Sequence, residues 1–213
     1  MPEAIRPVRA VVFDMDGTLF ESRDVVPDAY IDTILALGGP RYEPEQIVEA
    51  YSVGPPQAML THLVGRPVTG DEVERYLARL EEGAPGVEVY PGMVEALAAL
   101  RERVPLAVYT GASTRAAELL LDACSLRWGF DVVLGADRVP RPKPWPDGIE
   151  YACRELGVAS REAAYVGDSP NDLEAARRSG ALAVAAAWGH QYRPDEPADL
   201  VVPTPSGLLA LVD

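Results

Sequence analysis

Two carboxylates follow a short apolar run near the start of the chain. Asp14 and Asp16 come directly after the segment 10–13, which is apolar at every position, and Gly17 follows them. Such a run is typical of a parallel strand buried on both faces, and ligands collect beyond the carboxyl ends of these strands. Residues i and i+2 of an extended chain point the same way, so we expect both carboxylates to face one small volume, where a divalent cation or a shared proton relieves their repulsion. The alternative is an ordinary strand followed by an acidic turn.

Two later parts of the chain carry groups that could hold a phosphate. Thr110 and Gly111 come after the apolar run 106–109 and offer a hydroxyl and an unobstructed N–H, although a threonine at the end of a strand is more often structural. Lys143 is the only lysine among 19 lysine and arginine residues, and it lies between two prolines. A compact point charge is favoured over arginine where a planar guanidinium does not fit, so the position predicts a functional cation.

A second acidic turn follows the predicted strand 163–166. It contains Asp168 and Asp172, the latter at the start of a predicted helix. Capping of that helix explains Asp172 without any function, but it does not explain Asp168, which ends a buried strand as Asp14 does. We expect all of these polar groups to lie along one edge of the sheet, because the carboxyl ends of parallel strands meet there.

From residue 91 onward, predicted strands and helices alternate. The strands are expected at 106–109, 130–134, 163–166, 181–187 and 199–202, and the helices at 93–103, 115–125, 146–156, 171–179 and from Ser206 to the end. This alternation indicates an α/β fold with a Rossmann-like parallel sheet and helices on both faces, which the segment 10–13 joins.

Residues 21–88 have a different pattern. Helices are expected at 27–37, 44–51, 55–64 and 71–82, each opened by a proline or an acid and punctuated by glycine. We therefore expect a core of residues 1–20 and 89–213, which contains the sheet, and an inserted all-helical segment of residues 21–88.

Composition narrows the class of partner. The net charge of −14 and the pI near 4.5 disfavour binding to nucleic acids or anionic membranes. No apolar run approaches the length of about 18 residues that spans a bilayer. The two cysteines, Cys124 and Cys153, fall in helix-like segments and are expected to be reduced thiols. We therefore predict a soluble cytoplasmic protein.

In order and spacing, these residues resemble the four motifs of the haloacid-dehalogenase-like (HAD) hydrolases. The motifs are Asp14 to Thr18, Thr110, Lys143, and Gly167 to Asp172, and the similarity spans the whole chain, including a helical cap of the C1 type after the first motif. The phosphoglycolate phosphatase and pyrophosphatase-like subgroup is the most similar. One position departs from the pattern: Gly111 stands where relatives usually carry asparagine, so a side-chain contact would be lost.

The resemblance implies a Mg²⁺-dependent phosphatase that hydrolyses a small, phosphoglycolate-like phosphate monoester through an aspartyl-phosphate. Asp14 would be the nucleophile and Asp16 the general acid and base. The metal would be held by Asp14, the backbone carbonyl of Asp16, and Asp168.

The remaining motif residues are expected to hold the phosphoryl group. Thr110, Gly111 and Lys143 would bind it, and Asp172 would orient Lys143 or a metal-bound water. In the cap, the segment 53–56 resembles the specificity loop of the family. Gly54, Gln57 and His62 are accordingly expected to contact the leaving group.

Two alternatives stay open at this point. A sugar phosphomutase of the β-phosphoglucomutase type would use the same motifs, although Thr18 after Gly17 favours a phosphatase. A receiver-like signalling domain also uses an aspartate acceptor, a threonine and a lysine in this order, but its further acids precede the acceptor, and it carries no long helical insert. A haloacid dehalogenase is disfavoured because that chemistry lacks the second acid, Asp16.

Overall fold

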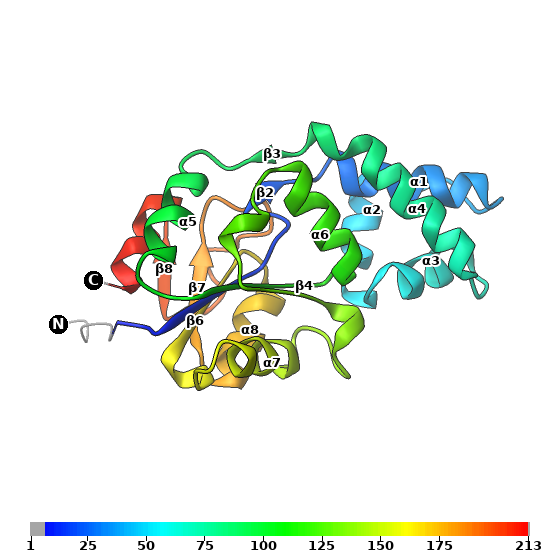
Figure 1. Cartoon of the computed structure of the whole chain (residues 1–213). Helices are drawn as coiled ribbons and strands as arrows, with labels where there is room; N and C mark the ends of the chain where they lie inside the picture. The colour runs from blue at the N-terminus through cyan, green and yellow to red at the C-terminus, as the bar shows by residue number, and fades with distance from the viewer. Residues whose placement is uncertain (1–6, 213) are drawn as a thin grey trace.

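A six-stranded parallel sheet forms the centre of the molecule (Figure 1). The structure is a computed structural model and describes residues 7–212, so residues 1–6 of the predicted core and Asp213 lie outside the described residues. The strand order is β5-β4-β1-β6-β7-β8. The strands are β1 (Ala10–Phe13), β4 (Leu106–Thr110), β5 (Val132–Gly135), β6 (Ala163–Gly167), β7 (Leu182–Ala186) and β8 (Leu200–Val202). The predicted α/β fold class is confirmed.

Helices cover both faces of this sheet because its central strands are apolar on both sides. Val11 and Phe13 of β1 belong to one core cluster, and Ala10 and Val12 belong to the other. One face is covered by α5 (Met93–Arg101), α6 (Thr114–Ala123) and the 3-10 helix η6 (Pro205–Leu211), and the other by α7 (Asp147–Glu155) and α8 (Pro170–Ser179). The helix expected from Ser206 is thus a 3-10 helix. Short 3-10 turns occur at η3 (Arg127–Gly129), η4 (Ala136–Arg138) and η5 (Ser160–Glu162).

The inserted segment is helical and lies at one end of the molecule, whereas β8 and the start of β1, near the two ends of the described chain, lie toward the opposite end (Figure 1). Its helices are α1 (Val25–Ala36), α2 (Pro44–Glu49), η1 (Ala50–Val53), α3 (Pro56–Val64), α4 (Gly70–Gly83) and η2 (Ala84–Gly86). Local signals explain several boundaries. Thr69 caps α4 through a capping box with Glu72, and Gly65 ends α3 with a φ of 79°.

A two-stranded antiparallel ribbon joins the insert to the core. It consists of β2 (Phe20–Glu21) and β3 (Glu88–Val89), with Phe20 paired with Val89. The sequence analysis did not predict this ribbon, because strands of two residues carry no periodic signal. The Gly17 N–H also donates to the Phe20 carbonyl at 3.0 Å. The two connections to the insert are therefore bonded to each other and to the turn that carries Asp14 and Asp16.

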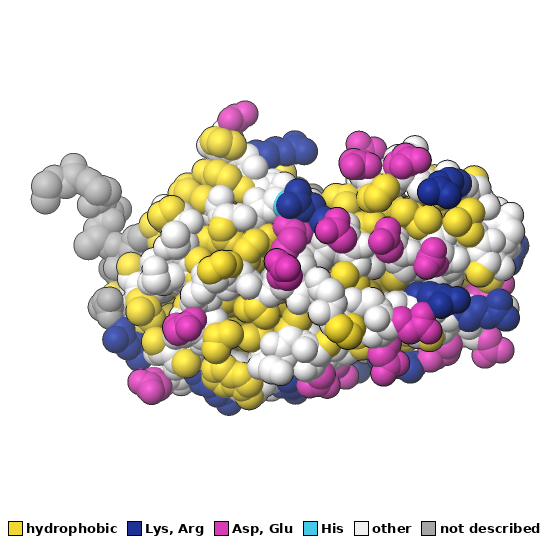
Figure 2. Space-filling model, turned by 90° about the horizontal axis from the view of Figure 1, so that it is seen from above, with side chains coloured by type: hydrophobic (Ala, Val, Ile, Leu, Met, Phe, Trp, Pro, Cys, Tyr) yellow, Lys and Arg dark blue, Asp and Glu magenta, His cyan; other side chains and the backbone are white. Residues whose placement is uncertain are grey.

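Charged and apolar side chains are mixed on the surface. On the face in Figure 2, acidic and basic side chains are interspersed, and no continuous basic stripe is visible. Among the described residues, no helix is long and apolar enough to cross a membrane. Cys124 and Cys153 are both free thiols.

The start of α7 packs closely against the sheet, and this contact gives a test of the core. A Cβ atom on Gly148 would lie 2.1 Å from the ring of the buried Tyr109. We expect Gly148→Ala to lower the free energy of unfolding by about 1–3 kcal/mol, because overpacking outweighs the helix-propensity gain of about 1 kcal/mol. Urea unfolding measures the change, and Glu150→Ala, at an exposed position of the same helix, is the control. A Gly148→Ala protein as stable as the parent would contradict this close contact.

Candidate active site

The polar strand ends meet at one edge of the sheet, as the spacing predicted. Asp14 follows β1, Thr110 ends β4, and Asp168 follows β6. β1 is paired in parallel with β4 on one side and with β6 on the other. The three side chains therefore come from adjacent strands at the carboxyl edge, where open α/β sheets bind their ligands.

The turn after β1 lies against Asp168 and requires glycine at position 17. The Asp14 N–H donates to the Val166 carbonyl at 2.8 Å, which extends the pairing of β1 and β6. Gly17 then adopts a φ of 78°, and a Cβ at this position would lie 2.4 Å from Oδ2 of Asp168. The two acidic turns are thus in contact, and any larger residue at Gly17 would displace Asp168.

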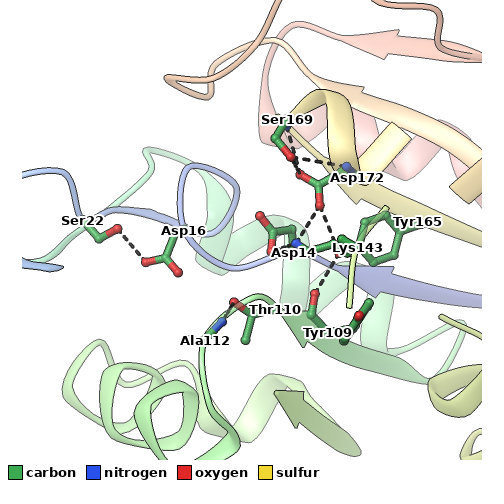
Figure 3. Close-up of polar contacts among 10 residues, drawn as sticks. All are labelled: Asp14, Asp16, Ser22, Tyr109, Thr110, Ala112, Lys143, Tyr165, Ser169 and Asp172. Atoms are coloured by element: carbon green, nitrogen blue, oxygen red, sulfur yellow. Dashed lines mark hydrogen bonds and ion pairs between the residues drawn. The ribbon is translucent and has the colours of Figure 1, made fainter. Parts of the chain in front are cut away.

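Lys143 lies between two buried carboxylates. Its Nζ is 2.6 Å from Oδ1 of Asp14 and 2.7 Å from Oδ1 of Asp172 (Figure 3). Burial alone would lower the pKa of Lys143, but the two carboxylates raise it well above its usual value. The ammonium ion is therefore charged and fixed in place.

Hydrogen bonds from neighbouring groups fix the Asp172 carboxylate beside Lys143. Its Oδ2 accepts hydrogen bonds from the Ser169 N–H at 3.0 Å and from the Ser169 hydroxyl at 2.6 Å. The Tyr165 hydroxyl lies 3.3 Å from its Oδ1 and 2.8 Å from the Tyr109 carbonyl. Both carboxylate oxygens of Asp172 are thus occupied by the protein.

Asp16 is held differently from Asp14. The Ser22 hydroxyl donates to Oδ1 of Asp16 at 2.6 Å, so this carboxylate is tied to the connection that leads into the helical insert (Figure 3). Burial raises the pKa of Asp16 above its usual value, against the opposing effect of Ser22. A raised pKa suits a carboxyl group that donates a proton.

Three buried carboxylates lie close enough together to bind a cation. One carboxylate oxygen from each of Asp14, Asp168 and Asp172 lies within 4.8 Å of the others. Oδ2 of Asp168 accepts the Gln191 N–H at 2.8 Å, whereas its buried Oδ1 has no partner. Burial raises the pKa of Asp14 to about 7 and that of Asp168 well above its usual value. The residues therefore fit a hard divalent metal ion, which would favour the ionised carboxylates. The Asp16 side chain is not part of this group.

Thr110 and Gly111 lie at the carboxyl end of β4. The Thr110 side chain is buried, and its hydroxyl oxygen accepts the Ala112 N–H at 3.2 Å. A Cβ on Gly111 would meet no atom within 4 Å. A Cβ atom could therefore be added at this position without a clash.

A cavity of about 80 Å³ lies between the sheet edge and the helical insert. On the sheet side it is lined by Asp14, Asp16, Thr110, Gly111, Ala112, Lys143, Ser169 and Gln191, and on the insert side by Val26, Tyr30, Tyr51, Gly54, Met59 and Tyr76.

The predicted insert residues only partly reach this cavity. Gly54 lines it, but Gln57 and His62 do not and are exposed on α3. The structure does not bring these two side chains to the cavity: α3 places the buried Met59 in the cavity wall and leaves Gln57 and His62 at the surface.

Several lining residues were not identified from the sequence. Ser169 could have been found, because it lies inside the motif with Asp168 and caps α8. Tyr30, Tyr51 and Tyr76 could not, because tyrosines at helical spacing are indistinguishable from ordinary core residues.

Known proteins are similar to this chain along most of its length. Residues 8–180 match the family model of haloacid dehalogenase-like hydrolases. A phosphoglycolate phosphatase of Chromobacterium violaceum is 33% identical over 93% of this chain and 93% of its own length. The probable phosphatase IndB of Dickeya dadantii is 35% identical over 84% of this chain and 81% of its own length.

Solved structures show the same relationship. The structure of CbbY from Rhodobacter sphaeroides in complex with phosphate has a TM-score of 0.84 and 28% identity, and the match covers 97% of this chain and 99% of CbbY. These relatives confirm the predicted enzyme class, a phosphatase, and do not favour the phosphomutase alternative. The family assignment also removes the receiver-like alternative. The chain belongs to the haloacid dehalogenase-like hydrolases.

Proposed function

We propose that this enzyme uses Mg²⁺ to hydrolyse a small, phosphoglycolate-like phosphate monoester through an aspartyl-phosphate at Asp14. The observation that carries the proposal is the position of the Asp14 carboxylate. It lies 2.6 Å from the Lys143 ammonium, and one of its oxygens lies within 4.8 Å of a carboxylate oxygen of Asp168, at the end of a buried strand. A carboxylate placed between a fixed cation and a metal site is a workable nucleophile for phosphorus.

The reaction takes two steps that balance in protons. An Asp14 oxygen forms a bond to phosphorus while the bond to the ester oxygen breaks, and Asp16 gives its proton to the departing alcohol. Asp16 then takes a proton from water, whose oxygen attacks the same phosphorus and releases inorganic phosphate and free Asp14. Asp16 suits both steps, because it lines the same cavity and burial raises its pKa.

The other residues bind and orient the phosphoryl group. Lys143, the Thr110 hydroxyl and the Gly111 N–H would contact its oxygens, and Asp172 positions Lys143. Mg²⁺, held by Asp14, Asp168 and the Asp16 carbonyl, would neutralise phosphoryl charge. Carboxylate and carbonyl oxygens are the donors that Mg²⁺ prefers, whereas imidazole and thiolate ligands favour softer metal ions.

Residues 21–88 serve in this proposal as a cap that closes over the site. The cavity is formed jointly by the sheet edge and the insert, so movement of the insert relative to the sheet would open or close it around a substrate. The ribbon of β2 and β3 is the place for such a hinge, because both connections to the insert pass through it. A cytoplasmic location is proposed with it, since Cys124 and Cys153 are free.

The metal site can be tested without turnover. We expect Mg²⁺ to raise the melting temperature of the parent protein, because binding to the folded state alone adds about 2.7 kcal/mol of stability at a metal concentration 100 times Kd. Asp168→Asn should lose most of this increase, whereas the exposed Asp195→Asn should keep it. Differential scanning calorimetry with and without Mg²⁺ makes the comparison, and phosphate release from a phosphate-ester panel should show the same metal requirement. An undiminished shift in Asp168→Asn would contradict the assigned ligands.

Lys143 tests the phosphoryl site. We expect Lys143→Arg to lower kcat/KM by about 100-fold or more, because the guanidinium fork cannot occupy the point between Asp14 and Asp172. The matched control is Arg141→Lys, the reverse exchange at an exposed position two residues away. Phosphate release under steady-state conditions measures both variants. If Lys143→Arg were as fast as the parent, a compact cation would not be required.

A further inference from the structure

A second hollow, of about 460 Å³, adjoins the active-site cavity at the junction between the core and the helical insert. The hollow and the cavity share Ser169 and Gln191 in their walls. On the core side, residues 169–171 at the start of α8 and residues 190–193 after β7 line the hollow, and on the insert side α2 and η1 line it. A leaving group attached to a phosphoryl group in the cavity therefore has a route into this hollow past Ser169 and Gln191.

Arg193 brings a positive charge without a counter-ion to this hollow. Many arginine side chains of the protein are paired with acids, as Arg23 is with Glu21 and Arg177 is with Glu174. Among the described residues, Arg193 has no such partner for its side chain, is exposed, and is the only arginine that lines the hollow. A guanidinium binds a carboxylate or a phosphate through two parallel hydrogen bonds, so Arg193 is a free anion-binding group beside the cavity.

His190 contributes a buried polar ring to the same hollow. Its side chain is 4% exposed, and neither ring nitrogen has a hydrogen-bond partner among the described residues. Nδ1 lies 3.3 Å from Oε1 of Glu21, but without the geometry of a hydrogen bond. Burial lowers the pKa of His190, so its neutral ring carries one N–H to donate. Because a buried polar group without a partner is costly, an acceptor atom of a ligand would satisfy this ring.

Hydrogen-bond donors gather on the core side of the hollow. The Asn171 amide and the Tyr192 hydroxyl line it together with Arg193 and His190. The one acid among the lining residues, Glu49, is exposed and belongs to α2 of the insert. An anion held against the core side would therefore meet one cation and several neutral donors there, with the acid on the insert side.

We propose that the core side of this hollow is a subsite for an anionic group on the leaving group of the substrate, with Arg193 as its charge partner and His190 as a hydrogen-bond donor. This inference rests on the proposed phosphatase function and deepens it. The phosphoryl group would lie beside Asp14 and Lys143, and the leaving group would extend past Ser169 toward Arg193. The anion is either a carboxylate, as in phosphoglycolate, or a second phosphate, because both match the guanidinium fork.

Three esters with the same two-carbon skeleton test the subsite. Phosphoglycolate carries a carboxylate, ethane-1,2-diol bisphosphate carries a second phosphate, and 2-hydroxyethyl phosphate carries a neutral hydroxyl group. With Mg²⁺ present, kcat/KM of the parent protein should be about tenfold or more higher for at least one anionic ester than for 2-hydroxyethyl phosphate. The anionic ester that is preferred identifies the source of the charge.

Substitution of Arg193 tests which residue is responsible. Arg193→Gln should lower kcat/KM for the preferred anionic ester by about tenfold and leave that for 2-hydroxyethyl phosphate nearly unchanged. The loss should appear as a raised KM with little change in kcat, because a contact with the leaving group is made in the ground state and the transition state alike. Arg193→Lys keeps the charge and should lose less. Arg161→Gln, which removes an exposed arginine outside the hollow, is the matched control.

Glu49 gives a second test of opposite sign. Glu49→Gln removes the negative charge from the insert side of the hollow and should raise the ratio of anionic to neutral ester activity by about threefold. Asp71→Asn removes the same charge at an exposed position of the insert outside the hollow and should leave the ratio unchanged.

The outcomes separate the subsite from the function beneath it. A parent protein that hydrolyses 2-hydroxyethyl phosphate as well as both anionic esters, or an Arg193→Gln protein with an unchanged ratio between the esters, would overturn the subsite and leave the phosphatase proposal intact. A parent protein that hydrolyses none of the three esters and no acetyl phosphate with Mg²⁺ would overturn both.

Discussion

The contact of one lysine with two buried carboxylates organises this molecule. The Lys143 side chain is 10% exposed and lies 2.6 Å from Asp14 and 2.7 Å from Asp172. Breaking a buried pair by removing one partner typically costs about 3–5 kcal/mol, because an unpaired charge stays behind. The contact joins the end of β1, the loop before α7 and the first turn of α8. These segments must therefore meet for the charges to be compensated, and their meeting creates the site.

Around this contact, the acids differ in environment and hence in the role we propose for each. Asp14 faces a cation, Asp16 is tied to Ser22, and Asp168 leaves one buried oxygen unpartnered. Carboxylates in unlike surroundings can serve as nucleophile, acid and metal ligand within a few ångströms. The Asp16 contact with Ser22 also joins the site to the helical insert, so the position of the insert and the position of the acid are linked.

Much of the core could be predicted from the sequence, because its signals are local. The apolar run before Asp14 indicates a buried strand, and the alternation of strands and helices after residue 91 indicates a parallel sheet. The lone Lys143 indicates a required cation. The side-chain positions of the helical insert were harder to predict. Its helices have start and stop signals, but their rotation about their own axes depends on tertiary contacts, which is why Met59 lines the cavity and Gln57 does not.

The ribbon of β2 and β3 and the three cavity tyrosines could not be predicted for a related reason. Phe20 and Val89 pair although residues 21–88 separate them in the chain, and no local pattern encodes such a contact. Tyr30, Tyr51 and Tyr76 meet only because α1, η1 and α4 pack together. Residues whose function depends on which helices are neighbours become visible only in the folded structure.

The central claim is that Asp14 carries the phosphoryl group during turnover. The most direct measurement is acid quenching of the enzyme with ³²P-labelled acetyl phosphate and Mg²⁺, followed by peptide mapping. The account predicts label on the peptide that contains Asp14, released by hydroxylamine as expected for an acyl phosphate, and no label in Asp14→Asn. Label on another residue, or rapid turnover in Asp14→Asn, would contradict it.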